Sequence, residues 1–140
     1  MAKKQQLKLD NAFDFMLIGI LCQHRDYRLC NAVNKAMGME FSRGADLELQ
    51  NGKTGEYSSF PLYECEDEDA RQYYILSNKD SNGRYLVPDQ SKMDYFVMLK
   101  GGFDKEEVEE IRQRLKTSGI ILAAYKMDVR KIKSKENLLF

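Results

Sequence analysis

Few side chains in this sequence could take part in acid–base or nucleophilic chemistry, and they are widely spaced. Asp94 and Tyr95 are adjacent, and the chain has a single histidine, His24. A carboxylate, a phenol and an imidazole could form an acid–base set if the fold brought them to one pocket. A serine or cysteine nucleophile would also need His24, and no glycine-flanked nucleophile motif is present. The sequence therefore identifies no catalytic residue, and whether the protein is an enzyme stays open.

Cys22, His24 and Cys30 come nearest to a metal-binding pattern. A structural zinc site takes four ligands with a characteristic paired spacing, and that spacing is absent here. The chain also lacks the GxxxxGK[ST] and GxGxxG motifs that bind nucleotide phosphates. The sequence therefore predicts neither a metal nor another cofactor.

Residues 87–95, VPDQSKMDY, separate two apolar segments. Pro88 has a fixed φ and disfavours a helical conformation at Val87, so Val87 is expected to end a strand. Asp89 and its polar neighbours suit a turn, in which side-chain oxygens accept hydrogen bonds from backbone N–H groups. The favoured interpretation is a structural corner between two strands. The alternative, in which Asp94 and Tyr95 face a pocket, stays open.

The same stretch resembles the signature of a bacterial family, the IPExxxVDY proteins. Pro88, Asp94 and Tyr95 match that signature, whereas Val87 replaces its isoleucine, Asp89 its glutamate and Met93 its valine. Segments DYRLCNAVNKAMG and KSKENLLF are also similar to members, so the resemblance covers nearly the full chain. The family has no assigned activity, and the resemblance therefore implies a candidate functional motif without a catalytic residue. Its members here are Val87, Pro88, Asp89, Met93, Asp94 and Tyr95.

Residues 126–140, KMDVRKIKSKENLLF, are called the tail below; they are rich in lysine and arginine and end in three apolar residues. The favoured interpretation is that the tail folds back over the protein's own core, with lysine stems covering apolar surface. The alternative is that it binds RNA, an acidic partner or a second copy of the chain. Further basic residues cluster around a predicted helix at 26–38: Arg25, Arg28, Lys35 and Arg43. The candidate partner-binding residues are Arg25, Arg28, Arg130, Lys131, Lys133, Lys135 and Phe140.

Tyr73 and Tyr74 are adjacent, so in a strand one would face inward and the other outward. An exposed tyrosine beside basic residues is typical of proteins that bind single-stranded RNA, although two tyrosines also fit plain strand propensity. The acidic segment 64–71, ECEDEDAR, is predicted to be a solvated hairpin tip.

The elements that must position these residues indicate an α+β fold in one domain, 1–140, with a mostly antiparallel sheet. We expect two helices near the N-terminus and one near the C-terminus. The first covers residues 12–22, an apolar run that is favoured as a buried helix, with a strand as the alternative. The second begins with Asp26 as its N-cap and ends at Gly38. A short strand is expected at residues 6–10.

From residue 39 to 86 the alternating pattern and turn-forming residues predict an antiparallel meander. A further strand is expected within 94–102. The next helix, within 104–119, has Asp104 as N-cap and Glu107 at the capping-box position, and a strand within 120–128 is expected to return to the sheet.

Composition limits the classes of function. Lys and Arg number 22 and Asp and Glu number 22, so the net charge is zero. This balance argues against a surface devoted as a whole to nucleic acid or an anionic membrane. The longest apolar run, residues 15–22, is far shorter than the roughly 18 residues that a membrane helix needs. Three cysteines without paired spacing and no signal-peptide pattern predict reduced thiols and a cytoplasmic location.

These observations favour a non-catalytic protein-interaction module that is able to self-associate. The alternative is an RNA-binding accessory protein that uses Arg25, Arg28, the tail and an exposed tyrosine. No membrane association is predicted.

Overall fold

The computed structural model describes residues 13–50 and 53–140. The strand expected at residues 6–10 lies outside these residues. No helix in the described part of the chain is both long and apolar enough to span a membrane.

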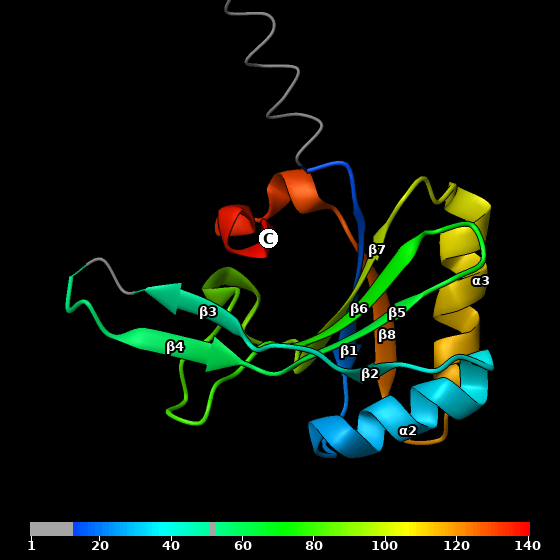
Figure 1. Ribbon diagram of the computed structural model, residues 1–140, viewed down its shortest axis with the longest axis horizontal. Coiled ribbons are helices and arrows are strands. Elements are labelled where there is room, and N and C mark those ends of the chain that lie inside the picture. The colour runs from blue at the N-terminus through cyan, green and yellow to red at the C-terminus, as the bar shows by residue number, and fades with distance from the viewer. Residues whose placement is uncertain (1–12, 51–52) are drawn as a thin grey trace, which may run out of the picture.

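A six-stranded antiparallel sheet forms the centre of the molecule (Figure 1). Its strand order is β2-β5-β6-β7-β1-β8. These strands are β1 (Met16–Leu21), β2 (Ser42–Arg43), β5 (Leu62–Glu66), β6 (Gln72–Ser77), β7 (Tyr95–Lys100) and β8 (Ala123–Met127). Strands β5, β6 and β7 follow one another as a meander, whereas β1 lies between β7 and β8.

Two further strands, β3 (Leu47–Gln50) and β4 (Tyr57–Phe60), pair only with each other and project to one side (Figure 1). The meander predicted for residues 39–86 is therefore antiparallel throughout, but it is divided between two sheets. Pro61 separates β4 from β5, and it has no N–H with which to continue a ladder.

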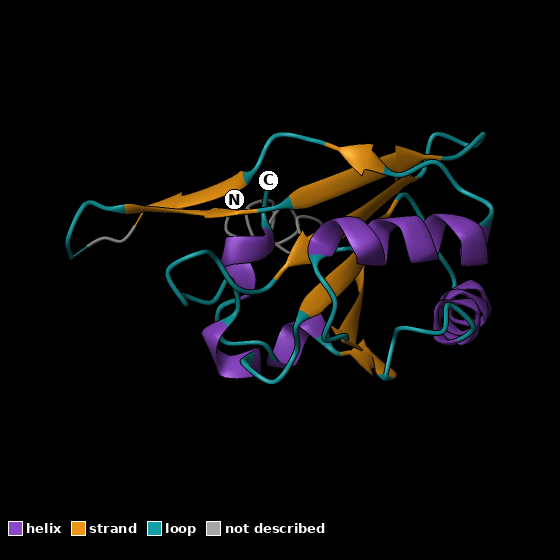
Figure 2. Ribbon diagram, turned by 90° about the horizontal axis from the view of Figure 1, so that it is seen from below, coloured by secondary structure: helices purple, strands orange, loops and turns teal. Residues whose placement is uncertain are grey.

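Both α-helices, α2 (Asp26–Met37) and α3 (Lys105–Lys116), pack on one face of the large sheet. Figure 2 shows the same arrangement from below, with the helices in purple and the strands in orange. Leu29, Cys30 and Val33 form the buried side of α2. The helix ends at Gly38, whose positive φ of 62° lets its N–H bond to the Asn34 carbonyl.

The helix α3 begins as its sequence predicts. Asp104 accepts a hydrogen bond from the Glu107 N–H, and the Glu107 side chain accepts one from the Asp104 N–H. At α2 the prediction was wrong, because the N-cap is Arg25 and Asp26 is the first helical residue. The carboxylate of Asp26 instead accepts hydrogen bonds from Tyr63 and Arg43.

The opposite face of the sheet is covered by irregular segments and short 3₁₀ turns. These turns are η1 (Pro88–Gln90), η2 (Val129–Lys131) and η3 (Lys135–Leu138). Leu86, Val87, Val129, Ile132 and Leu138 pack there against Leu17, Phe96 and Met98. The sheet is thus buried on both faces.

This second layer explains why the prediction of a helix at residues 12–22 was wrong. Residues 16–21 form strand β1, and the helices at 26–37 and 105–116 are the α-helices of the described residues. Ile18 and Ile20 face the α-helices, while Leu17 faces the other layer. A strand covered on both faces is apolar at every position and loses the alternation that identifies a strand in a sequence.

Candidate functional site

Residues 87–95, the candidate motif, surround the buried side chain of Asn78, which is 0% exposed. Its amide nitrogen donates hydrogen bonds to the carbonyls of Gln90 (2.9 Å) and Met93 (2.8 Å). Its amide oxygen accepts one from the Val87 N–H at 2.8 Å. One side chain therefore satisfies three backbone groups of the motif and fixes the turn that Pro88 begins.

Asp94 and Tyr95 connect the motif to the segment that leads from β1 into α2. Asp94 accepts a hydrogen bond from the Cys22 N–H at 2.9 Å, and the Tyr95 hydroxyl donates one to the His24 carbonyl at 2.7 Å. Burial raises the pKa of Tyr95 well above its ordinary value, and the neighbouring Cys22 adds to the rise. The side chain therefore stays a neutral phenol at neutral pH. Both side chains bind main-chain atoms and not the His24 imidazole, an arrangement that suits a structural corner.

Met93 packs against the sheet over a glycine. A Cβ atom at Gly19 would lie 2.6 Å from the Met93 sulfur and 3.0 Å from that of Met127. The absence of a side chain at Gly19 thus leaves the space in which Met93 packs, and it brings the motif against the centre of β1.

Asp89 holds the tail, a contact that the sequence does not predict. Its carboxylate accepts hydrogen bonds from the N–H groups of Lys133 (2.8 Å) and Ser134 (3.2 Å) and from the Ser134 hydroxyl. Partial burial acts to raise the pKa of Asp89, but the hydrogen bonds from Ser134 and Lys133 outweigh it, so the pKa lies below its ordinary value. Asn137 adds a bond to the Leu86 carbonyl at 2.8 Å.

The tail folds back over the core, as its favoured interpretation predicts. Val129, Ile132 and Leu138 are buried, whereas Arg130, Lys131 and Lys133 are exposed. The Phe140 ring packs edge-to-face on Tyr74 with centroids 5.1 Å apart, and the Lys100 ammonium donates to the Phe140 carbonyl at 3.1 Å. Phe140 itself remains 47% exposed.

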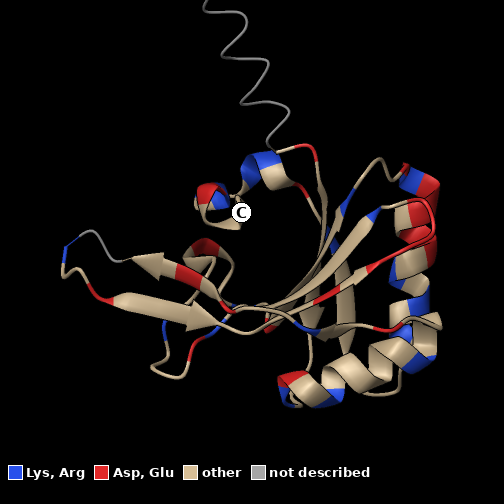
Figure 3. Ribbon diagram, viewed as in Figure 1, with Lys and Arg blue, Asp and Glu red and all other residues tan. Residues whose placement is uncertain are grey.

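The candidate partner-binding residues do not form one surface. Arg25 and Arg28 belong to the start of α2 on the helix-covered face, and the tail covers the other face. Figure 3 shows the two groups of basic residues at opposite ends of the molecule. A single ligand that contacts both groups would have to wrap around the sheet.

The paired tyrosines face opposite sides, as predicted. Tyr73 is 7% exposed and packs with the helix-side core, and Tyr74 lies on the tail side. Burial raises the pKa of Tyr74, and the carboxylates of Glu64 and Glu66 raise it further. The outward tyrosine is thus close to acids, which would repel the phosphates of an RNA strand stacked on it.

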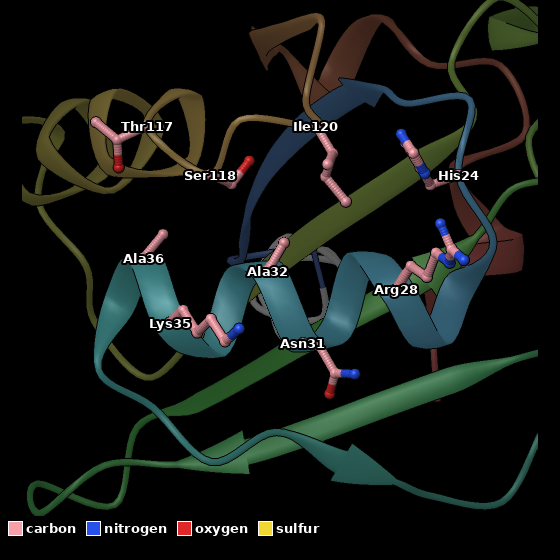
Figure 4. Close-up of a pocket in the computed structure, with 9 residues that line it drawn as sticks. All are labelled: His24, Arg28, Asn31, Ala32, Lys35, Ala36, Thr117, Ser118 and Ile120. Atoms are coloured by element: carbon pink, nitrogen blue, oxygen red, sulfur yellow. The ribbon is translucent and has the colours of Figure 1, made fainter.

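A groove with a volume of about 610 Å³ lies between α2 and the loop that joins α3 to β8 (Figure 4). Its lining residues are His24, Arg28, Asn31, Ala32, Lys35, Ala36, Thr117, Ser118 and Ile120. The residues from α2 recur at intervals of three and four, so they share one side of the helix. In Figure 4, His24 and Arg28 lie side by side at one end, and Thr117 and Ser118 lie towards the other.

The groove carries positive charge that the protein does not neutralise with an ion pair. Arg28 and Lys35 are exposed, and the lining includes no acidic residue. Residues 13–50 and 53–140 contain six ion pairs, none of which involves Arg28 or Lys35. Asp26, the acid in the first turn of α2, is already bound by Arg43 and Tyr63.

One polar atom in the groove lacks a partner within the protein. The Ser118 hydroxyl oxygen is buried and makes no hydrogen bond to the described residues. Buried polar groups are seldom left unpaired in this way.

Sequence patterns identify only part of this groove. Arg28 and Lys35 are seven residues apart in a predicted helix, a spacing that places both on one side. The opposite wall comes from residues 117–120, more than 80 positions later, and only the packing of α3 against the sheet brings it there. Arg25 does not line the groove, and Arg43 is paired with Asp26 and Asp46.

The residues that came nearest to a metal pattern are dispersed. Cys22 and Cys30 are buried, and the Cys30 thiol donates to the Phe41 carbonyl at 3.5 Å, while His24 lies exposed in the groove. Across the described ranges, no group of three or more His, Cys, Asp or Glu side chains could hold a metal ion.

Comparison of the chain with protein-family models and with curated proteins returned no match. The resemblance to the IPExxxVDY family therefore stays a prediction.

Proposed function

We propose that this protein is a non-catalytic protein-interaction module that binds an acidic segment of a partner protein in the groove beside α2. The observation that carries the proposal is the pair of exposed cations, Arg28 and Lys35, in a lining without an acid. Unpaired positive charge in a groove attracts a negatively charged partner and repels a positively charged one.

Binding is favoured over catalysis by the state of the reactive groups. The side chains of Asp94 and Tyr95 bind the main chain at Cys22 and His24, respectively. The groove is lined by His24, but no carboxylate or cysteine in the lining could act with it.

The dimensions of the groove suit an extended peptide. Arg28 and Lys35 are seven helical residues apart, which is about 10 Å along the axis. In a polyproline II conformation, which is extended and has three residues per turn, residues three positions apart lie on one side and are separated by about 9 Å. Acidic residues at positions i and i+3 of a partner would therefore reach both cations. Ala32, Ala36 and Ile120 line the space between them and would contact apolar side chains of the same segment.

A protein segment fits the lining better than RNA does. Single-stranded RNA is usually bound by aromatic rings on which bases stack, and the groove has no Phe, Tyr or Trp in its lining. The tyrosine expected to serve this role, Tyr74, lies on the other face of the sheet beside Glu64 and Glu66.

The proposal also includes a cytoplasmic location and membership of the IPExxxVDY family. Three free thiols, at Cys22, Cys30 and Cys65, support a cytoplasmic site of action. The motif at 87–95 supports membership of the bacterial IPExxxVDY family, in which we assign it the role of connecting β1, β7 and the tail.

Fluorescence polarisation with a labelled peptide of repeated Glu-Leu-Ala-Glu units tests the groove. We expect saturable binding that weakens at least tenfold in the double variant Arg28→Glu/Lys35→Glu. The matched control Arg130→Glu/Lys131→Glu reverses two exposed tail cations and should bind as the wild type does. Equal weakening in both variants would show attraction by net charge alone and contradict the groove.

The same assay with labelled oligouridine separates the RNA alternative. We expect oligouridine to bind more weakly than the peptide and with no difference between the two variants. Tighter binding to oligouridine that is lost in Arg28→Glu/Lys35→Glu, with a steep salt dependence, would assign the groove to RNA.

A further inference from the structure

Charges of opposite sign occupy the two ends of α3. Glu106 and Glu110 are exposed in its first half, and Arg114 and Lys116 are exposed in its last turn. Figure 3 shows red segments beside a blue one at the end of α3 that adjoins the β5–β6 turn, and blue segments at the end that adjoins α2. The basic residue at the first end is Lys105, which is exposed among the acids. The helix has 12 residues, so the two ends are separated by about 18 Å.

The β5–β6 turn adds to the acidic end. Arg71 binds both Asp67 and Glu107, and this joins the turn to the first turn of α3. Glu68 and Asp69 at the tip are exposed, and neither takes part in an ion pair within the described ranges. The helix dipole explains why acids are found in the first turn of α3 and basic residues in its last turn. It does not explain Glu68 and Asp69, which lie outside the helix in the β5–β6 turn.

Hydrogen bonds to Asp67 fix the main chain of this turn, with Glu68 and Asp69 exposed at its tip. Asp67 accepts hydrogen bonds from the Asp69 N–H (3.0 Å), the Arg71 N–H (2.9 Å) and the Tyr73 hydroxyl (3.0 Å). Ala70 has a φ of 62°, and among the described non-glycine residues it is alone in having a positive φ. Such a conformation is maintained only where the surroundings fix it, and a fixed turn loses little entropy on binding.

We propose that two copies of this chain pair along antiparallel α3 helices, with the acidic end of each copy against the basic end of the other. The acidic end comprises Glu68, Asp69, Glu106 and Glu110, and the basic end Arg114 and Lys116. A two-fold axis that crosses α3 at its middle places the acidic end of each copy against the basic end of the other. The same contact is therefore made twice in the dimer. Exposed charges interact weakly and are screened by salt, so the dimer is weak and forms at low ionic strength.

Sedimentation velocity of the full chain, from about 5 to 500 µM protein, tests this dimer. We expect a concentration-dependent dimer in 20 mM NaCl and a monomer in 500 mM NaCl. The variants Glu68→Lys/Asp69→Lys and Arg114→Glu/Lys116→Glu should each be monomeric at both salt concentrations. Reversal of two exposed tail cations, Lys131→Glu/Lys133→Glu, is the matched control and should leave the dimer intact.

A mixture of the two α3-end variants gives the decisive result. In a mixed dimer the reversed acidic end of one variant faces the reversed basic end of the other, and the two unchanged ends also face each other. An equimolar mixture should therefore form a dimer with one copy of each variant. A wild type that is monomeric at 500 µM in 20 mM NaCl, or a mixture that stays monomeric, overturns the proposal. If circular dichroism shows that a reversed variant is unfolded, the neutral variants Glu68→Gln/Asp69→Asn and Arg114→Gln/Lys116→Gln replace the pair, and each must weaken the dimer.

The dimer and the peptide-binding groove are separate proposals with separate readouts. Arg28→Glu/Lys35→Glu should still dimerise, and Glu68→Lys/Asp69→Lys should still bind the acidic peptide. Loss of both properties in both variants would contradict the assignment of two surfaces.

Discussion

The corner at residues 87–95 and the groove beside α2 differ in what their polar side chains bind. At the corner, Asn78, Asp89 and Asp94 each accept hydrogen bonds from main-chain N–H groups of the same protein. In the groove, Arg28 and Lys35 are exposed and form no ion pair within the described structure. The first region uses its polarity to hold the fold, and the second leaves its polarity available to a ligand.

This difference separates a recognisable motif from a candidate site. The motif draws attention in the sequence because proline, acids and tyrosine stand together, yet these residue types are also the ones that build turns. The groove residues come from a helix and a distant loop and form no motif at all. Substitutions at the corner should therefore change stability, and substitutions in the groove should change binding.

The largest expected effect is at Asn78. Asn78→Ala leaves the Val87 N–H and the Met93 carbonyl without partners and removes one of the two hydrogen bonds to the Gln90 carbonyl, which keeps the one from the Met93 N–H. We therefore expect a loss of about 3 kcal/mol in the free energy of unfolding. The melting temperature should fall by roughly 10 °C. Urea denaturation and calorimetry measure both quantities. Asn31→Ala, in the groove, is the control and should unfold like the wild type; equal losses in the two variants would remove the distinction between the regions.

An intermediate and pH-dependent effect is expected at Asp89. Its pKa is lowered in the folded protein, so the stabilisation is fully present above the unfolded pKa of about 3.9 and is lost as the pH falls through the lower folded value. Asp89→Asn should cost about 1 kcal/mol at pH 7, as for the loss of a capping residue. Urea denaturation between pH 7 and 2.5 should show the difference from the wild type shrinking below about pH 4. A difference that is constant with pH would mean that the charge of Asp89 does not hold the tail.

The smallest effect on stability is expected in the groove. Arg28→Gln/Lys35→Gln removes two charges that make no ion pair in the described structure, and the free energy of unfolding should stay within about 0.5 kcal/mol of the wild type. Peptide binding measured on the same samples should nevertheless fall. A loss of more than 1 kcal/mol, about the typical cost of a point mutation, would show that these residues stabilise the fold, as the residues of the corner do.

Elements whose signals are local could be predicted well from the sequence. The capping box of α3 needs only Asp104 and Glu107 three positions apart, and the stop of α2 needs only glycine at position 38. The acidic turn between β5 and β6 follows the same rule. In each case the residues that decide the conformation are neighbours in the chain.

The tertiary structure decided what depends on distant partners. Strand β1 carries no alternation because residues 86–93 and 129–138 cover the face that the helices leave open, and nothing within residues 16–21 indicates that cover. Asp26 was predicted as a helix cap, but Tyr63 and Arg43 bind its carboxylate across the fold.

The same limit applies to the candidate site. By itself, the sequence determined that the protein has an α+β fold, a net charge of zero, and basic residues both around α2 and in the tail. Only the tertiary structure decided that these two basic groups lie on opposite faces of the sheet, and that residues 117–120 complete a groove with α2. The physical reason is that charge and turn propensity belong to single residues and short segments. A cavity, in contrast, is made by surfaces that meet only after the sheet has formed and both of its faces have been covered.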